Sequence, residues 1–192
     1  MPQSSHSPLI LASASPRRAE LLRNAGISFI VAPSDVPEVR QQTESPDQFV
    51  RRVAREKAAA VAKIYPGRLV LGADTDVIVG DQVLGKPSDA DDARAMLRLL
   101  SGRTHVVMSG VTLLGPGIDD TRIESTTVTF VEITDDEISA YVASGEPMDK
   151  AGAYAIQGIA SRWIPRIEGC YFNVVGLPVP LVYRMLKENG FM

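Results

Sequence analysis

An acidic residue near the middle of the sequence has the surroundings of a catalytic or metal-binding group. Asp74 lies in the segment Gly-Ala-Asp-Thr-Asp at 72–76, directly after the hydrophobic residues 69–71, which predict a buried strand. Ligand-facing acids in open α/β sheets gather at the carboxyl ends of strands. Asp74 is therefore a candidate metal ligand or general base for water, and a turn acid that hydrogen-bonds its own backbone is the alternative. Asp76, two residues later, is expected to face away from Asp74.

A lysine within the hydrophobic face of a helix is the second candidate. The capping box Ser-Pro-Asp-Gln at 45–48 predicts the start of a long helix that ends before Pro66-Gly67. At about 100° per residue, Lys57 falls inside the apolar stripe of this helix, whereas the other basic residues fall on the opposite half. A lysine in that position either extends its ammonium group to the surface or meets an anionic partner such as a phosphate or a carboxylate. The pattern leaves both open.

Three further places carry polar or basic groups that could bind an anion or a base. Ser15 and Pro16 predict a helix start, where backbone N–H groups and the pair Arg17-Arg18 would favour an anion; the alternative is an ordinary capped helix with its arginines in water. Lys86 stands between a glycine and a proline, and Gln157 between an isoleucine and a glycine. The Gln157 amide could read the edge of a base by paired hydrogen bonds. A loop lysine and a core glutamine bonded to the backbone are the structural alternatives.

The composition excludes several classes of function. The chain has 192 residues, 45% hydrophobic and 22% charged, with a formal net charge of −3, as in an ordinary globular protein. An acidic chain without a basic stripe is not expected to bind nucleic acid, and no apolar run approaches the roughly 20 residues that span a membrane. Cys170 is the single cysteine, so a reducing cytoplasm is the expected location. Residues 1–8 are expected to be a loose tail without the features of a targeting segment.

The elements that must position these residues alternate between strands and helices. Strand segments next to helical segments, together with long adjacent strands, predict an α/β fold with a mixed sheet and flanking helices. Strands are expected at 9–12, 27–31, 69–71, in a hairpin at 77–84, at 104–114 and 122–133, near 162–167, and in a last segment that ends at 175. Helices are expected from 16 to a stop at Gly26, from 46 to about 65, at 89–100, from 135 to 144 and after Pro178.

Seven segments follow one another along the chain: LILASASPRRAELL at 9–22, AREKA at 54–58, GADT at 72–75, LGKP at 84–87, LSGRTH at 100–105, DKAGAYAIQG at 149–158 and VVGLP at 174–178. Taken in order, these motifs resemble the Maf family over nearly the whole chain beyond the tail. The resemblance implies a fold similar to that of inosine-triphosphate pyrophosphatases: a twisted mixed sheet with flanking helices, and two lobes around a cleft. It also implies one catalytic domain at 9–192.

The resemblance also implies an activity and a role for each matching residue. Members of the family hydrolyse a nucleoside triphosphate to the monophosphate and pyrophosphate with a divalent metal, Mg²⁺ or Mn²⁺. Asp74 matches the proton acceptor, and Lys57 belongs with it among the expected catalytic residues. Four residues match positions expected to hold the triphosphate: Ser13, Arg18, Lys57 and Lys86. Three residues match positions that mark the subgroup acting on dTTP and UTP: Arg17, Thr75 and Gln157.

By the same resemblance, Glu38 and Asp74 are the expected metal ligands. Glu38 follows Pro37 where relatives often carry two neighbouring acids, so one acid is expected at this position. The resemblance further implies a homodimer. An alternative function is a nucleotide-responsive regulator of cell division, since the family is also associated with inhibition of septum formation. A regulator could dispense with Asp74, so the intact GADT segment favours the enzyme.

Overall fold

The structure is a computed structural model that describes residues 7–192. Most of the predicted tail, residues 1–6, lies outside the described residues. The chain divides into two compact units. Unit 1 contains the chain up to Asp74 together with Ser109–Glu124 and Gly176–Met192, and unit 2 contains Thr75–Met108 and Ser125–Val175.

Strands and helices alternate along the described chain, as the sequence predicts. The strands are β1 (Leu9–Leu11), β2 (Phe29–Val31), β3 (Val70–Val79), β4 (Gln82–Leu84), β5 (Thr104–Gly115), β6 (Ile118–Thr129) and β7 (Arg166–Glu168). The α-helices are α1 (Pro16–Asn24), α2 (Pro46–Ala62), α3 (Ala90–Leu100), α4 (Asp135–Ala143), α5 (Tyr171–Val175) and α6 (Val179–Glu188). Short 3₁₀ helices span Glu146–Asp149, Ala151–Ala153 and Ile159–Trp163.

The strands of residues 7–192 form a seven-stranded sheet in the order β2-β1-β3-β5-β6-β7, with β4 paired to β3. β1 runs parallel to both β2 and β3, whereas β4 is antiparallel to β3 and β7 is antiparallel to β6. The predicted α/β fold with a mixed sheet and flanking helices is confirmed. Within residues 7–192, no helix combines the length and the apolar character needed to cross a membrane.

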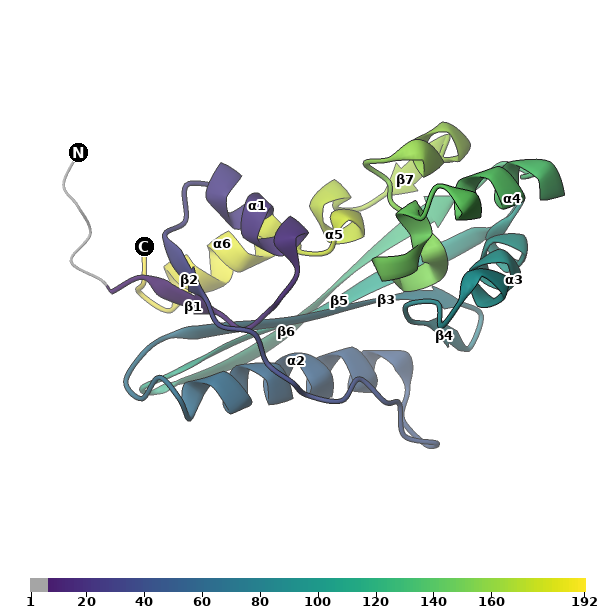
Figure 1. Cartoon of the computed structure of the whole chain (residues 1–192). Helices are drawn as coiled ribbons and strands as arrows, with labels where there is room; N and C mark the ends of the chain where they lie inside the picture. The colour runs from purple at the N-terminus through teal and green to yellow at the C-terminus, as the bar shows by residue number, and fades with distance from the viewer. Residues whose placement is uncertain (1–6) are drawn as a thin grey trace. The chain divides into compact units, whose positions relative to one another are not determined.

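In unit 1, α2 lies against the sheet at very short range. A Cβ atom on Gly72 of β3 would lie 2.2 Å from the Ala54 carbonyl oxygen, and one on Gly110 of β5 would lie 2.1 Å from that of Val50. Only glycine permits this approach of helix and sheet. Figure 1 shows α2 along one side of these strands, with α1 and α6 on the other. Lys57 in the middle of α2 is thereby brought close to β3.

Unit 2 has its own core, in which aromatic side chains pack among more numerous aliphatic ones. Phe130 and Tyr154 contact edge to face, as do Tyr141 and Trp163. The local signals of the sequence are confirmed here: Asp89 caps α3, and Thr134 opens α4 with a capping box. Val79 pairs with Gln82 across the predicted two-residue hairpin turn. The buried core residues of unit 2 include Val77, Leu97, Leu100, Val107, Val128, Ile133, Ile138, Val142 and Ala160.

Three predicted elements differ from the structure. β3 does not end at Leu71 but continues through the Gly-Ala-Asp segment to Val79, because nearly all of its side chains are buried and hydrogen-bonded strands flank it. The strand predicted near 162–167 is present only at its end, because Ile159–Trp163 is a 3₁₀ helix and β7 begins at Arg166. The strand predicted to end at Val175 is the helix α5. A short apolar run does not distinguish a strand from a buried helix.

Candidate active site

A buried lysine and two carboxylates form the centre of the candidate site, all in unit 1. The Lys57 ammonium lies 2.7 Å from Asp74 Oδ1 and 2.5 Å from Glu38 Oε1. Lys57 and Asp74 are 6% and 3% exposed, whereas nearly half of the Glu38 side chain is accessible. The Lys57 ammonium group therefore does not extend to the surface but is buried with anionic partners, which is one of the two alternatives that the sequence left open. A buried ammonium group with two carboxylate partners is electrostatically compensated within the protein.

The two oxygens of Asp74 have different surroundings. Oδ1 accepts the bond from Lys57, whereas Oδ2 is buried and has no hydrogen-bond partner among the described residues. A buried carboxylate oxygen without a partner is costly in a folded protein. Its presence is typical of a site that is completed by a ligand, a metal or water. The structure thus places one oxygen of Asp74 in a position to accept a proton or to bind a cation.

Asp76 does not follow the expectation that it faces away from Asp74. Both residues belong to the continuous strand β3, and side chains two residues apart in a strand point to the same face. Asp76 is itself buried, at 8% exposure. The expectation of opposite faces is therefore wrong, because alternation separates neighbours in a strand and not residues two apart.

Ser13 and Arg18 form a buried pair at the start of α1. The Arg18 guanidinium donates to Ser13 Oγ at 3.2 Å, to the Ala73 carbonyl oxygen at 2.9 Å and to the Gly176 carbonyl oxygen at 2.9 Å. Ser15 caps the helix, and Pro16 opens it, as predicted. Arg18 thus joins the residue before Asp74 to the link between α5 and α6. Arg17, its neighbour, is partly exposed.

The loop that carries Glu38 is held by an ion pair that the sequence analysis missed. Arg52 of α2 donates to both oxygens of Glu44, at 2.7 and 2.9 Å, and also to the Val39 carbonyl oxygen at 3.0 Å. The hydrogen bond from Arg52 lowers the pKa of Glu44, against the opposing effect of burial. Arg52 therefore fixes the backbone directly after Glu38. Its position opposite the apolar stripe of α2 suggested only a solvent-exposed charge.

Unit 2 contains the other predicted site residues. Lys86 is exposed, and the carbonyl oxygen of the preceding Gly85 accepts a hydrogen bond from Gly152 N at 3.0 Å. A Cβ atom on Gly152 would lie 2.7 Å from the Val77 side chain, so the segment around Gly152 packs closely against β3. Gln157 is exposed, which excludes a core glutamine. Thr75 is half-buried and is the first residue of this unit, covalently joined to Asp74.

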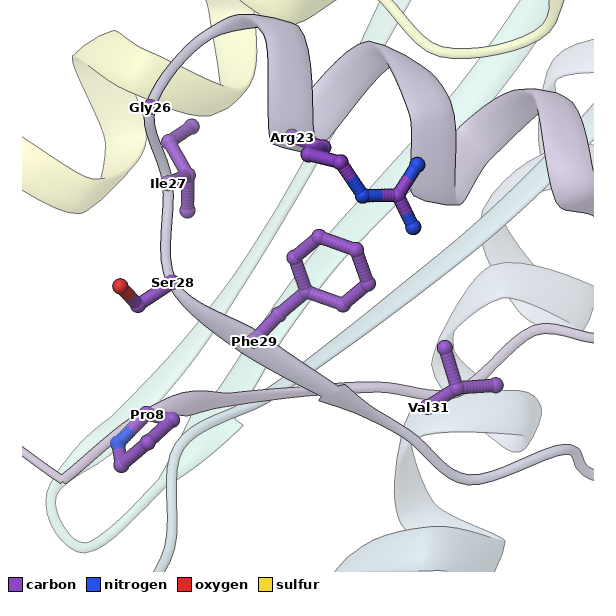
Figure 2. A pocket seen from close by; sticks show the side chains of 7 residues that line it. All are labelled: Pro8, Arg23, Gly26, Ile27, Ser28, Phe29 and Val31. Atoms are coloured by element: carbon purple, nitrogen blue, oxygen red, sulfur yellow. The ribbon is translucent and has the colours of Figure 1, made fainter.

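The surface hollow that the structure shows near β2 is not part of this site. It has a volume of about 550 Å³ and is lined by Arg23, Phe29 and Val31 with parts of the neighbouring turn (Figure 2). None of the predicted site residues lines it. Across residues 7–192, no group of three or more histidine, cysteine, aspartate or glutamate side chains is arranged to hold a metal ion.

Comparison with known proteins gives the family of the chain. The family model described as "Maf-like protein" matches residues 8–189. A dTTP/UTP pyrophosphatase from Koribacter versatilis is 56% identical over 184 residues, which cover 96% of this chain and 95% of the relative. A dTTP/UTP pyrophosphatase from a Geobacillus species is 50% identical over 95% of this chain and 98% of its own length.

Likeness to solved structures is more distant. The Staphylococcus aureus Ham1 protein shares 15% sequence identity, with coverage of 95% of this chain and 100% of that chain and a TM-score of 0.49. The curated relatives carry the names of enzymes, and the expectation of an enzyme is confirmed. With a family match over almost its full length and relatives at half identity or more, the chain belongs to the Maf family.

Proposed function

We propose that the protein hydrolyses nucleoside triphosphates, dTTP and UTP above all, to the monophosphate and pyrophosphate. The names of the curated relatives support this substrate class. The observation that carries the chemistry is the buried pair of Lys57 and Asp74, in which one carboxylate oxygen is bonded to the ammonium group and the other has no partner among the described residues. A general base needs an available oxygen whose orientation is fixed.

In this mechanism Asp74 Oδ2 accepts a proton from a water molecule while the oxygen of that water attacks the α-phosphorus. The new bond joins the water oxygen to that phosphorus, and the bond from the α-phosphorus to the oxygen that bridges it to the β-phosphorus breaks. The electron pair leaves with pyrophosphate, and the hydroxyl oxygen stays on the monophosphate. Lys57 keeps Asp74 in one orientation throughout, since its ammonium group lies 2.7 Å from Oδ1.

Cationic side chains neutralise the phosphate oxygens and the charge that develops on the leaving group. Lys57 and Lys86 supply ammonium groups for this purpose, and Arg18 adds a guanidinium that is already bonded to Ser13. The Arg18 bonds to the carbonyl oxygens of Ala73 and Gly176 also fix the backbone next to Asp74. Arg18 would therefore contribute through position as well as charge.

The residues present fit a divalent metal ion. Mg²⁺ is commonly held by one or two carboxylates, with substrate phosphates and water as its other ligands. Glu38 and Asp74 are two such carboxylates near one another through Lys57, and the oxygen Asp74 Oδ2 has no protein partner among residues 7–192. These two residues would hold the ion, and because a carboxylate oxygen carries two lone pairs, Asp74 Oδ2 would keep one of them for the proton. When bound, the metal would supply positive charge at the phosphate oxygens.

Selection of the base is assigned to Arg17, Thr75 and Gln157, which match the subgroup positions of the family. An amide such as that of Gln157 offers a donor and an acceptor at fixed spacing. Uracil and thymine present two carbonyl groups that flank an N–H group, whereas cytosine replaces one carbonyl with an amine. A site arranged for the first pattern penalises cytosine, because a mismatched buried hydrogen bond costs about 1–3 kcal/mol.

The test is incubation of the protein with a panel of purine and pyrimidine nucleoside triphosphates, with Mg²⁺ and with Mn²⁺ separately, while pyrophosphate release is followed. The expected result is turnover of dTTP and UTP with kcat/KM values about tenfold or more above that of CTP. Inertness across the whole panel would overturn the proposal and would favour the nucleotide-responsive regulator.

A further inference from the structure

The turn that carries Gln157 is held at both ends by one pair of side chains in unit 2. Ala155 N donates to the Tyr141 hydroxyl at 3.2 Å, and Ile159 N donates to both oxygens of Glu146, at 3.1 and 3.2 Å. The Tyr141 hydroxyl in turn donates to Glu146 Oε1 at 2.9 Å. A bond from Gly158 N to the Ala155 carbonyl oxygen, 3.1 Å long, closes the turn itself. The residues on either side of Gln157 are thus tied to the same tyrosine and glutamate.

The position after Gln157 requires glycine because of this glutamate. Gly158 has φ −108° and ψ −151°, an extended conformation that other residues can adopt. A Cβ atom at this position would, however, lie 2.1 Å from Glu146 Oε1. The Glu146 carboxylate occupies the space that a side chain would need. Close approach of the carboxylate to the turn, and not backbone freedom, is therefore the reason for glycine here.

The Tyr141–Glu146 pair is itself held rigidly. Tyr141 is 1% exposed, and its ring packs edge to face on Trp163 with a centroid distance of 5.2 Å. Burial raises the pKa of Tyr141, and the hydrogen bond to Glu146 raises it further, so the phenol keeps its proton and stays a donor. The Glu146 backbone is fixed as well, because its carbonyl oxygen accepts a bond from Lys150 Nζ at 2.6 Å.

We propose that Tyr141 and Glu146 are positioning residues for Gln157 and thereby determine the selectivity of the enzyme among pyrimidine nucleotides. The inference rests on the proposed function, in which the Gln157 amide reads the base. Gln157 is exposed at the centre of a turn whose ends are both fixed. A polar group reads its ligand best when surrounding hydrogen bonds hold it in place, and a displacement of about 1 Å can cost as much as a hundredfold in rate.

Two conservative substitutions test the inference. Tyr141→Phe removes one oxygen atom and leaves the ring on Trp163, and Glu146→Gln keeps the shape but replaces one acceptor oxygen with a donor. In each variant we expect the ratio of kcat/KM for dTTP to that for CTP to fall at least about fivefold. The fall should come mainly from a higher KM for dTTP, with kcat within about twofold of the wild type, since Lys57 and Asp74 are unchanged.

Matched controls separate positioning from a general loss of stability. Glu137→Gln changes another carboxylate of unit 2 that accepts bonds from a backbone N–H and an aromatic donor, those of Thr134 and Trp163. Tyr154→Phe removes another buried hydroxyl of this unit, which is bonded to His105. Both controls are expected to lower the thermal unfolding midpoint while the dTTP to CTP ratio stays at the wild-type value.

Gly158→Ala provides a second, independent test of the same contact. Its Cβ atom would displace the Glu146 carboxylate, so we expect the same loss of selectivity. In the double variant Glu146→Ala, Gly158→Ala the obstruction is gone, and the second substitution should add less than about twofold to the effect of Glu146→Ala alone. Fully multiplicative effects of the two substitutions would contradict the proposed contact.

The outcomes distinguish failure of the inference from failure of the proposed function. If Gln157→Ala flattens the preference while Tyr141→Phe, Glu146→Gln and Gly158→Ala leave it unchanged, the positioning role is overturned and the proposed function stands. If the wild type does not prefer dTTP over CTP, or if Gln157→Ala leaves the preference intact, the base-reading role of Gln157 is overturned and the inference falls with it.

Discussion

Lys57 Nζ lies 2.7 Å from Asp74 Oδ1, and the other oxygen of the same carboxylate is buried without a hydrogen-bond partner among the described residues. The ammonium group therefore fixes the orientation of a carboxylate whose second oxygen stays available. The lysine belongs to the middle of α2 and the aspartate to β3, and Gly72 allows these elements to approach each other. The bond between Lys57 and Asp74 thus depends on the close packing that Gly72 permits.

Asp74→Asn is expected to reduce kcat by about 10²–10⁴-fold, because an amide cannot accept the proton from water. The fold should persist, since Asn has nearly the same volume and can still accept a bond from Lys57. The measurement is steady-state turnover of dTTP together with a thermal unfolding midpoint. Activity close to that of the wild type would assign the base to another acid, with Glu38 and Asp76 as the candidates.

Lys57→Met is expected to abolish most activity and to destabilise the protein at neutral pH. Methionine preserves the length and the apolar packing but leaves the buried carboxylate of Asp74 without its partner, and breaking a buried pair in this way costs about 3–5 kcal/mol. Denaturant unfolding at pH 7 measures the effect on stability. Lys63→Met, at the exposed end of the same helix, is the matched control and should change neither quantity. Unchanged kinetics in Lys57→Met would refute its place in the site.

The fold was predictable where the signal is local. Ser15, Ser45 and Thr134 cap their helices through bonds to residues three positions away, and such bonds depend only on the neighbouring sequence. α5 was not predictable, because its buried Asn173 donates to the Val107 carbonyl oxygen and to Thr126 Oγ1, which are 66 and 47 residues away. Contacts at that separation decide the conformation of a short segment but leave no periodic pattern.

The candidate site was predictable in its residues more than in its connections. The helical periodicity placed Lys57 on the buried face of α2, and the structure shows it there. The partner Glu38 depends on a loop that Arg52 and Glu44 hold in place, and a charged pair on an otherwise polar helix face has no distinctive pattern. The bonds of Tyr141 and Glu146 to the turn at Gln157 were also missed, because they join side chains to backbone groups 14 and 13 residues away and leave no periodic pattern.

His105 is expected to make stability dependent on pH. Burial lowers the pKa of its imidazole from 6.5 to about 4, and its Nε2 lies 2.8 Å from the Tyr154 hydroxyl. Between these two values the unfolded chain binds a proton that the folded chain does not, so the free energy of unfolding falls as the pH is lowered from about 6.5 to about 4. The contribution is about 3 kcal/mol over this window.

The comparison of wild type and His105→Phe isolates this contribution from the carboxylates that titrate in the same range. Denaturant unfolding at pH 7.0, 5.5 and 4.5 should show a steeper loss of stability in the wild type than in the variant. Tyr154→Phe added to His105→Phe removes the hydroxyl that would otherwise lack its partner. Parallel pH profiles of wild type and variant would show that His105 has the same pKa in the folded and the unfolded chain, which would contradict the lowered value.

Gln157→Ala is expected to flatten the preference for dTTP and UTP over CTP while pyrophosphate release continues. The phosphate-binding cations and Asp74 are untouched, so only the energy that distinguishes the bases, about 1–3 kcal/mol for each mismatched bond, is lost. The measurement is kcat/KM for the three nucleotides in wild type and variant. Unchanged ratios would transfer the selectivity to Arg17 and Thr75, whose variants are then the next to compare.

The most direct test of attack at the α-phosphorus is hydrolysis of dTTP in ¹⁸O-labelled water under single-turnover conditions, with the products resolved by mass spectrometry. We predict dTMP that carries one ¹⁸O atom and pyrophosphate that carries none, because the water oxygen joins the α-phosphorus. In Asp74→Asn the same labelling should appear at the reduced rate. Label in the released pyrophosphate, or formation of dTDP and labelled phosphate, would contradict the proposed reaction.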